Sequence, residues 1–262
     1  MNIHPSAIIE AGATLGPACQ IGPFCHIGPQ VQLGAGVRLH SHVAISGDTV
    51  IGDNTEIWPF ASVGSQPQDL KFAGEHTRLR IGARNMIRES VSINPGTVGG
   101  GGLTEIGDDC LFMLGTHVGH DCRVGNRVVV ANHASLAGHV EVGDGAIIGG
   151  LAGIHQFVRL GEGAIVGALS MVVADVIPYG SVSGERPRLA GLNLIGLKRR
   201  GVARDDISAM RAAYKALFFG EGSLRGRAEA LLEQAENPHV KQIIAFVLSD
   251  SDRSFCTPKE KK

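Results

Sequence analysis

Isoleucine, leucine or valine occupies every sixth position over most of the first two thirds of the chain, with a single phenylalanine exception. The positions are Ile3, Ile9, Leu15, Ile21, Ile27, Leu33, Leu39, Ile45, Ile51, Ile57 and Val63, then Ile81, Ile87 and Ile93, and then Ile106, Phe112, Val118, Val124, Val130, Leu136, Val142, Ile148, Ile154, Leu160, Val166 and Val172. The first gap keeps the phase of the pattern, and the second shifts it by one residue. A period of six fits neither an amphipathic helix nor one long strand, and is typical of a parallel β-helix.

Each coil of such a β-helix has three short faces, so one turn takes three of the six-residue repeats. We expect one apolar side chain per face to point into a triangular core, with successive coils about 4.8 Å apart. Glycine often follows the apolar residue, as in Leu15-Gly16 and Ile21-Gly22. We expect these glycines at the corners, where a positive φ or a close backbone approach favours glycine.

The repeat stops near Pro178, and the pattern then changes to a helical one. We expect two domains, a β-helix over 1–178 and a helical domain over 191–255. Residues 179–190 (YGSVSGERPRLA) are predicted to be a linker because they are rich in Gly, Ser and Pro. Helices are predicted from Asp205-Asp206 to Gly220, around 223–235 and from Asn237-Pro238 onward, and the tail 258–262 is expected to be disordered.

Two excursions interrupt the β-helix. The first, about 64–80, reads GSQPQDLKFAGEHTRLR, and the second, about 94–105, reads NPGTVGGGGLTE. Segments that leave so regular a scaffold usually carry function. The four consecutive glycines could contact a phosphate, but they lack the lysine and the strand-to-helix setting of a P-loop. A flexible insertion is the preferred interpretation of the second excursion.

Composition places the protein among cytoplasmic proteins. The net charge of −1 gives no indication of nucleic acid or of an anionic membrane surface as a partner. The five cysteines form no CxxC pair, which favours reduced thiols. The repeat begins at Ile3 and no apolar run could span a bilayer, so we expect neither a signal peptide nor an integral membrane segment.

Four histidines fall close together in the last part of the repeat: His117, His120, His139 and His155. Stacking at eighteen residues places His120, Gly138 and Gln156 in one column, and Asp121 beneath His139 in the next. A single histidine here would be an ordinary surface residue. As a group, they suggest a general base beside a carboxylate, with a glycine N–H available to an oxyanion.

Two other interpretations use the same features. Three imidazoles, from His117, His120 and His139, could bind zinc as in γ-class carbonic anhydrases, although the spacing is a poor match. A non-catalytic β-helix scaffold would need no such cluster of histidines. Catalysis without a metal is the preferred interpretation.

Several motifs go beyond the repeat. They are Ile21-Gly-Pro-Phe-Cys25, Gln68-Asp-Leu-Lys-Phe-Ala-Gly-Glu75, Ile87-Arg-Glu-Ser-Val91, Gly99-Gly-Gly-Gly-Leu-Thr104, His117-x-x-His-Asp121, Leu136-Ala-Gly-His139, Ile154-His-Gln-Phe157 and Gly196-Leu-Lys-Arg-Arg-Gly201. With these motifs the chain resembles, nearly end to end, the acyl-ACP:UDP-N-acetylglucosamine O-acyltransferases of lipid A biosynthesis. The resemblance implies a left-handed β-helix, against the usual right-handed crossover.

The same resemblance implies the reaction and the partners. An (R)-3-hydroxyacyl chain would pass from acyl carrier protein to the 3-hydroxyl of UDP-N-acetylglucosamine, the first step of lipid A biosynthesis. The acyl carrier protein thioester is the donor, and no other cofactor is expected. The family is a homotrimer with active sites between subunits, and exposed Lys and Arg of the helical domain would meet the acidic carrier protein.

The resemblance also implies roles for individual residues. His120 would be the general base, Asp121 would orient it, and the N–H of Gly138 would stabilise the oxyanion. The substrate-binding residues would be Gln68, Asp69, Lys71, Asn94, His117, His139, His155, Gln156, Asn193, Arg199 and Arg200. Arginine suits a diphosphate because its planar fork can bond two oxygens.

Two positions depart from the family pattern. Asn94 stands where the family commonly has a histidine, and Ile195 where it often has a glutamate. Both face the sugar nucleotide in the family, so the acceptor could be a UDP 3-amino sugar, which would give an amide. Neutral drift with the ordinary acceptor is the favoured interpretation. Ala168 stands where the family sets acyl-chain length, and alanine in place of glycine predicts a chain somewhat shorter than the family's longest.

Overall fold

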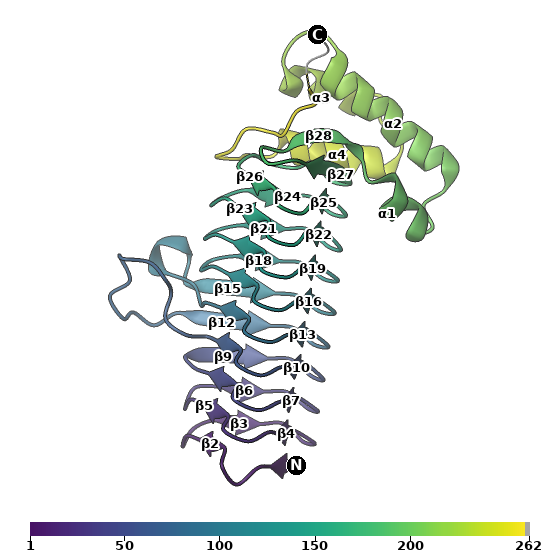
Figure 1. Ribbon diagram of the computed structural model, residues 1–262. Helices are drawn as coiled ribbons and strands as arrows, with labels where there is room; N and C mark the ends of the chain where they lie inside the picture. The colour runs from purple at the N-terminus through teal and green to yellow at the C-terminus, as the bar shows by residue number, and fades with distance from the viewer. Residues whose placement is uncertain (260–262) are drawn as a thin grey trace.

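The computed structural model describes residues 1–259. The chain coils through three β-sheets that form the faces of a prism, and their strands are parallel except at the last strand, which pairs antiparallel with its neighbour (Figure 1). Sheet A contains β1 (Asn2–Ile3), β4 (Gln20–Ile21), β7 (Arg38–Leu39), β10 (Glu56–Ile57), β13 (Met86–Ile87), β16 (Leu111–Phe112), β19 (Val129–Val130), β22 (Ile147–Ile148), β25 (Ile165–Val166), β27 (Gly180–Ser183) and β28 (Arg188–Leu192). Sheet B contains β2 (Ile8–Ile9), β5 (His26–Ile27), β8 (Ala44–Ile45), β11 (Ser62–Val63), β14 (Ser92–Ile93), β17 (His117–Val118), β20 (Ser135–Leu136), β23 (Gly153–Ile154) and β26 (Met171–Val172). Sheet C contains β3 (Thr14–Leu15), β6 (Gln32–Leu33), β9 (Asp48–Ile51), β12 (Arg78–Ile81), β15 (Leu103–Ile106), β18 (Arg123–Val124), β21 (Glu141–Val142) and β24 (Arg159–Leu160).

The register of the sheets follows the sequence repeat. Ile3 pairs with Ile21, and Val130 pairs with Ile148, so each predicted apolar position stacks on the next at a spacing of eighteen residues. The stacked side chains are buried along the prism. The exception is the first coil, where Ile3 is 39% exposed because no coil lies below it.

The two excursions leave from one edge of the prism, the turns from sheet B to sheet C, which we call the BC edge. Ile51 pairs with Ile81, and Ile81 pairs with Ile106, instead of with residues eighteen positions away. The first insertion is therefore a multiple of six and keeps the phase, whereas the second is one residue longer than six and shifts it. Both excursions end earlier than predicted, at β12 and β15, because the strands of sheet C are four residues long there.

The glycines that follow the apolar residues are needed for close approach. A Cβ on Gly16 would lie 2.5 Å from the carbonyl carbon of Gly34 in the next coil. The positive φ occurs two residues later in each turn, and mostly at residues other than glycine, such as Ala18 (φ 61°), Asp121 (φ 59°) and His139 (φ 62°). Of the two reasons expected for these glycines, close approach is thus the one that applies at Gly16.

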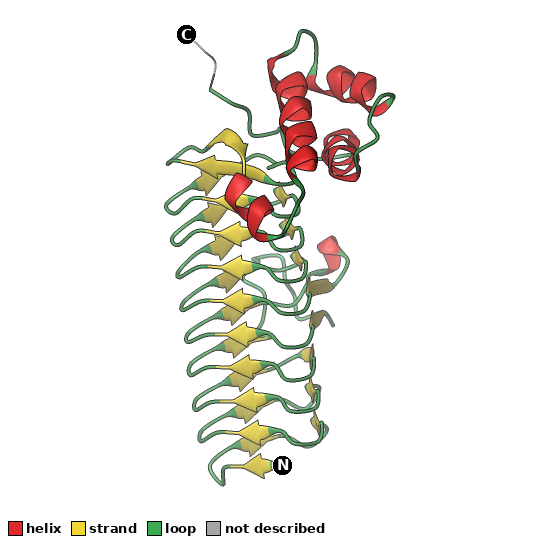
Figure 2. Ribbon diagram, turned by 90° about the vertical axis from the view of Figure 1, so that its right-hand side faces the viewer, coloured by secondary structure: helices red, strands yellow, loops and turns green. Residues whose placement is uncertain are grey.

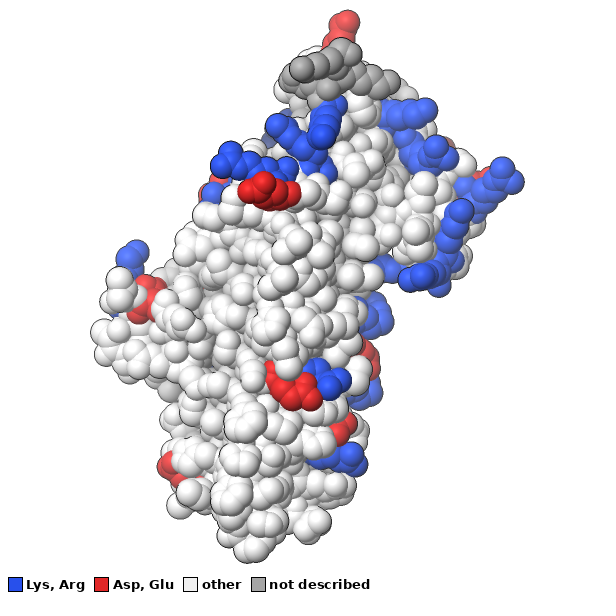
Figure 3. All heavy atoms as spheres, viewed as in Figure 1, with Lys and Arg blue, Asp and Glu red and all other residues white. Residues whose placement is uncertain are grey.

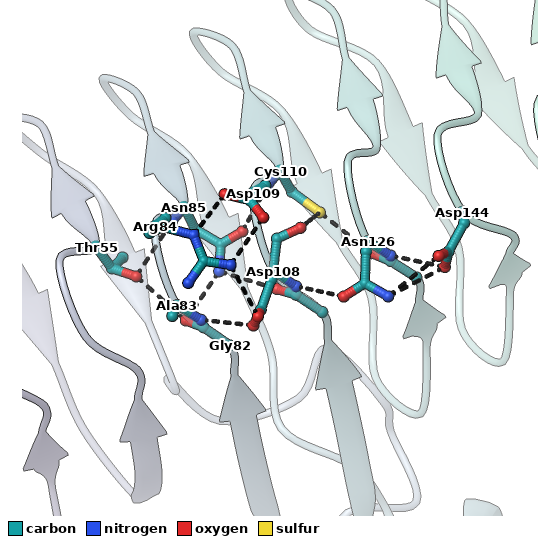
Figure 4. Close-up of polar contacts among 12 residues, drawn as sticks. Thr55, Gly82, Ala83, Arg84, Asn85, Asp108, Asp109, Cys110, Asn126 and Asp144 are labelled. Atoms are coloured by element: carbon teal, nitrogen blue, oxygen red, sulfur yellow. Dashed lines mark hydrogen bonds and ion pairs between the residues drawn. The ribbon is translucent and has the colours of Figure 1, made fainter. Parts of the chain in front are cut away.

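Polar side chains join the coils along the CA edge, the turns from sheet C to sheet A (Figure 4). The fully buried amide of Asn85 donates to the carbonyl oxygens of Gly82 and Gly107, at 2.9 Å each. Asp108 accepts from the N–H of Ala83 at 2.8 Å, and the same contact recurs in the next two coils. These bonds satisfy backbone groups that the sheets leave unpaired, and they make the CA edge rigid.

The predicted linker over 179–190 is wrong. Residues 180–192 form an antiparallel hairpin of β27 and β28, and β27 extends sheet A by pairing with β25. The sequence is rich in Gly and Ser, but Val182 and Leu189 are buried against the last coil. Packing of these two side chains outweighs the local preference for a loop.

Four α-helices follow at the C-terminal end of the prism (Figure 2). They are α1 (Leu194–Arg199), α2 (Arg204–Phe219), α3 (Leu224–Leu232) and α4 (Pro238–Leu248). The last three confirm the predicted helices; α1 is too short for a periodic pattern and was not predicted. Of the tail expected to be disordered, residues 260–262 lie outside the described part. Within residues 1–259, no helix combines the length and the apolar character needed to cross a membrane.

A C-terminal strap, residues 249–256, ties the helices back to the last coil. Asp175 is fully buried, and its backbone pairs with Ser254 and Cys256 at 2.8 Å. Its carboxylate accepts from the Nε of Arg159 at 2.8 Å and from the hydroxyl of Ser251 at 2.7 Å, and the Nη2 of Arg159 completes the ion pair at 2.7 Å. The strap is therefore anchored on one buried ion pair.

Candidate active site

His120 and Asp121 form a hydrogen-bonded pair on the BC edge. The Nδ1 of His120 lies 2.8 Å from the Oδ2 of Asp121, whose side chain is 1% exposed. A carboxylate accepts, so the proton is on Nδ1 and the lone pair is on Nε2. This arrangement leaves Nε2 able to take a proton from a substrate.

The carboxylate of Asp121 is held from a second side. Thr97, in the second excursion, donates its N–H to Oδ1 at 2.8 Å and its hydroxyl to Oδ2 at 2.6 Å. The N–H of Asp121 in turn donates to the hydroxyl of Thr104 at 2.8 Å. These bonds from Thr97 and to Thr104 hold Asp121 in its orientation toward His120.

Gly138 lies directly above His120, as the stacking of the repeat predicted. A Cβ on Gly138 would lie 2.5 Å from Cε1 and 2.6 Å from Nε2 of that imidazole. Only glycine leaves space at the reactive nitrogen. Among residues 1–259, no group accepts a hydrogen bond from the N–H of Gly138.

His117 and His139 flank the pair as neutral imidazoles. Burial lowers the pKa of His117, and the nearby His120 lowers it further. Burial also lowers the pKa of His139, against the opposing effect of Asp121. The ring of His139 stacks on Phe157 with centroids 4.4 Å apart, and His117 binds the hydroxyl of Ser92 through Nδ1 at 2.8 Å. Both rings can donate or accept as neutral groups near pH 7.

His120 opens on a cavity of about 460 Å³ over sheet B, whereas Asp121 and His139 line a second hollow together with Gly100. The walls of the cavity at His120 include seven of the fifteen predicted site residues, namely Gln68, Asn94, His117, His120, Gly138, His155 and Gln156. Gln68 comes from the first excursion, whose Asp69 is close enough to influence His139. Lys71 is exposed, and its N–H donates to Asp69 at 3.0 Å. The excursions thus form part of the same site as the histidines.

Asn94 is bound to the base of the first excursion. Its amide nitrogen donates to the carbonyl oxygens of Ser65 at 3.0 Å and Gln66 at 3.3 Å. The side chain is buried, and its Oδ1 has no partner in the described part of the chain. Asn94 therefore holds the loop that carries Gln68, and one acceptor oxygen remains free at the cavity.

Four of the predicted residues lie away from the BC edge. Arg200 donates to the carbonyl of Gly145 at 2.5 Å on the CA edge, and Asn193 caps α1 while donating to Gly163 at 3.1 Å. Arg199 is exposed at the end of α1. Ala168 is exposed at the AB edge, the turns from sheet A to sheet B. Within one chain, none of these four residues lines the cavity at His120.

The zinc alternative loses one of its ligands. Among residues 1–259, the one group of three potential ligands within 4.8 Å is His120, Asp121 and His139. His117 is not a member, so the three-imidazole set is not assembled. The oxygens of Asp121 are already bonded to Thr97 and His120, which suits an orienting carboxylate better than a ligand.

Two residues at the site were missed from the sequence. Thr97 is one, and its only signal was its place beside the glycine run. Arg253 is the other: from the strap, its Nε donates to the carbonyl of Gln156 and its Nη2 to the Nδ1 of His155, at 2.9 Å each. Nothing in the sequence near Arg253 indicated that it would return to the BC edge.

A β-helix of six-residue repeats with a histidine–carboxylate pair beside a cavity on its outer face is typical of an acyltransferase of the hexapeptide-repeat class. Residues 12–47 match the family described as bacterial transferase hexapeptide (six repeats), and residues 175–256 match domain 2 of UDP-N-acetylglucosamine O-acyltransferase. The chain belongs to the acyl-[acyl-carrier-protein]–UDP-N-acetylglucosamine O-acyltransferase family. It is 53% identical over 260 residues to the member from Caulobacter vibrioides, with 99% of both chains covered.

Other relatives agree with this assignment. The enzyme of the same name from Paracoccus denitrificans is 58% identical over 202 residues, which is 77% of either chain. A crystal structure of a UDP-N-acetylglucosamine acyltransferase superposes with a TM-score of 0.96 at 45% identity, covering 99% of this chain and 100% of that one. LpxA from Acinetobacter baumannii gives 0.93 at 42% identity, with 97% and 98% covered. The predicted fold class, a left-handed parallel β-helix with a C-terminal helical domain, is confirmed.

Proposed function

We propose that the protein transfers an (R)-3-hydroxyacyl chain from acyl carrier protein to the 3-hydroxyl of UDP-N-acetylglucosamine, in the cytoplasm, as the first step of lipid A biosynthesis. The names of its relatives support the two substrates. The observation that carries the proposal is the His120–Asp121 pair, with its free Nε2 facing an open cavity. The thioester is itself an activated donor, so the reaction requires no further cofactor.

In this mechanism His120 acts first as a base. Its Nε2 takes the proton of the sugar hydroxyl as that oxygen attacks the thioester carbonyl, and Asp121 stabilises the imidazolium. The N–H of Gly138 donates to the oxyanion of the tetrahedral intermediate. Collapse of the intermediate releases the carrier thiolate, which recovers the proton from His120. The neutral His117 and His139, with His155 and Gln156, hold the sugar nucleotide.

The separation of the predicted residues supports active sites between subunits of a homotrimer. His120 is on the BC edge. Arg200 contacts the CA edge, and Arg199 precedes it in the chain. The sheets of the prism lie between these two edges. One nucleotide can reach both groups only if they come from different copies of the chain. A symmetric ring of three copies gives three identical sites of this kind.

Subunit mixing tests this arrangement. His120→Ala and Arg199→Ala are each expected to be inactive alone. In mixed trimers that contain both variants, about one third of the sites should combine an intact His120 with an intact Arg199, because one of the three interfaces receives both residues. We expect activity to return to roughly that fraction of wild type, measured after co-expression and tandem-tag purification. No recovery would place both residues in one subunit.

The carrier protein is expected to dock on the helical domain. Lys and Arg side chains gather over α1 to α3, while much of the β-helix face in the same view carries few charges (Figure 3). Arg204, Arg211 and Lys215 on α2 are exposed. A basic surface of this kind attracts an acidic partner and raises its association rate.

Product analysis by mass spectrometry tests the proposed reaction. The enzyme is given a ladder of (R)-3-hydroxyacyl-ACPs with UDP-N-acetylglucosamine or with its 3-amino analogue. We expect an ester on the ordinary sugar. An amide formed only on the amino sugar would make Asn94 and Ile195 determinants of the acceptor.

The same ladder tests the role of Ala168. We expect the wild-type profile to peak below the longest chain of the family, and Ala168→Gly to move the peak to longer chains. Each methylene that fits or fails to fit is worth about 10- to 200-fold in discrimination. Ala164→Gly, inside the core of the same coil, serves as a control. Equal profiles for wild type and Ala168→Gly would remove Ala168 from the acyl site.

A further inference from the structure

We propose that Thr97 and Gly100, in the second excursion, form a clamp that positions Asp121 for catalysis. The inference rests on the proposed function, because a positioning residue acts only through the His120–Asp121 pair. It replaces the sequence-based interpretation of the glycine-rich segment as a flexible insertion. The group that this segment binds is the side chain of Asp121 in the same chain.

The contacts of Thr97 carry the first part of the argument. Its N–H and its hydroxyl reach different oxygens of the same carboxylate, at 2.8 and 2.6 Å. Rotation of the carboxylate would break one or both bonds and would turn Oδ2 away from His120. Because hydrogen bonds to an ionised group are stronger than neutral ones, the pair of donors from Thr97 holds Asp121 in one orientation.

Gly100 carries the second part. A Cβ built on Gly100 would lie 2.0 Å from the Cγ of Asp121 and 2.3 Å from Oδ2. The short helical turn η1 (Val98–Gly100) therefore lies directly on the carboxylate, and it leaves the Asp121 side chain 1% exposed. Exclusion of water strengthens the interaction between Asp121 and the imidazolium that forms during the reaction. By contrast, a Cβ on the adjacent Gly99 would meet no atom within 4 Å.

The position of the excursion adds a third point. It leaves the prism at the BC edge after β14, one coil before His120. The insertion thus places a backbone segment beside Asp121 that the uninterrupted coil could not supply. In the next two coils, where no insertion follows, His139 and Phe157 occupy the same column as Asp121 and stack on each other.

Substitutions of Thr97 test the clamp. Thr97→Val removes the hydroxyl and keeps the shape, and we expect kcat to fall about tenfold to a hundredfold because a charge-assisted hydrogen bond is lost. KM for both substrates should change little, and Thr97→Ser should restore kcat. The matched control is Thr116→Val: Thr116 is fully buried in the adjacent coil, and its hydroxyl has no partner in the described part of the chain.

A glycine pair gives an independent test. Gly100→Ala should lower kcat at least as much as Thr97→Val, whereas Gly99→Ala should retain wild-type kcat. Thermal unfolding of each variant shows whether the fold is kept. Wild-type kcat in both Thr97→Val and Gly100→Ala, with His120→Ala inactive, would overturn the clamp and leave the proposed function intact. Full activity in His120→Ala would overturn both.

Discussion

Product formation by His120→Ala is expected to fall about 10²- to 10⁴-fold, the usual contribution of a general base. The substitution removes Nε2, the nitrogen of the pair that faces the cavity and has no hydrogen-bond partner among residues 1–259. We expect His117 and His139 not to replace it, because the Nδ1 of His117 is bonded to Ser92 instead of to a carboxylate, and the Nε2 of His139 lies 3.8 Å from Asp121. The measurement is the initial rate of acyl transfer to UDP-N-acetylglucosamine at saturating substrates.

The control for this variant is His4→Ala. His4 is an exposed histidine of the first coil, far along the prism from the cavity. It should leave the rate unchanged, and both variants should show the circular dichroism of the wild type. A rate for His120→Ala within threefold of wild type would exclude the base mechanism and would reopen the metal and scaffold alternatives.

Asp175→Ala is expected to lower the free energy of unfolding by about 3–5 kcal/mol, the cost of breaking a buried ion pair from one side. The carboxylate is fully buried, and its removal leaves the guanidinium of Arg159 without its charged partner. The strap also loses the bond from Ser251. Urea unfolding at a fixed protomer concentration gives the free energy, since assembly contributes to apparent stability.

Asp252→Ala is the matched control for Asp175→Ala. Asp252 is an exposed carboxylate in the same strap, and its loss should cost less than about 1 kcal/mol. The strap also carries Arg253 to His155 and Gln156. Asp175→Ala should therefore raise KM for the sugar nucleotide in the protein that remains folded. Equal stabilities for the two variants would show that the ion pair does not anchor the strap.

Most of the fold could be predicted because the repeat acts at every coil. One inward residue in six sets the register, and the register then stacks His120 beneath Gly138 without any further information. The same reasoning placed Asp121 next to His139. The Nε2 of His139 lies 3.8 Å from the carboxylate of Asp121. The repeat pattern does not predict structure that depends on contacts between residues distant in sequence. The β27–β28 hairpin has a loop-like composition and forms because the last coil offers an unpaired strand.

The repeat itself predicts only the part of the site that lies on the coils, and the resemblance added Gln68 and Asn94 from the excursions. His117, His120 and Gly138 lie on coils, whereas Thr97 and Arg253 arrive from segments with no period. The contact of Arg253 with His155 joins residues 98 positions apart, and no local rule predicts it. Asn94 is a different case, because the sequence drew attention to the residue but not to its contacts. The resemblance singled out Asn94 as a departure from the family, and the structure adds its bonds to the carbonyl oxygens of Ser65 and Gln66.

The first coil is exposed at its outer end, whereas the last coil is covered. Local stability should therefore increase along the prism from the first coil to the last. At one end the helices and the strap cover the core, and at the other Ile3 meets water. In a linear array, each coil is stabilised only by its neighbours, so opening should begin at residue 1 and advance toward the helices. The catalytic coils lie beyond the midpoint of that path. We therefore expect several N-terminal coils to unfold before the site does, and their unfolding would leave the histidine pair and its clamp in place.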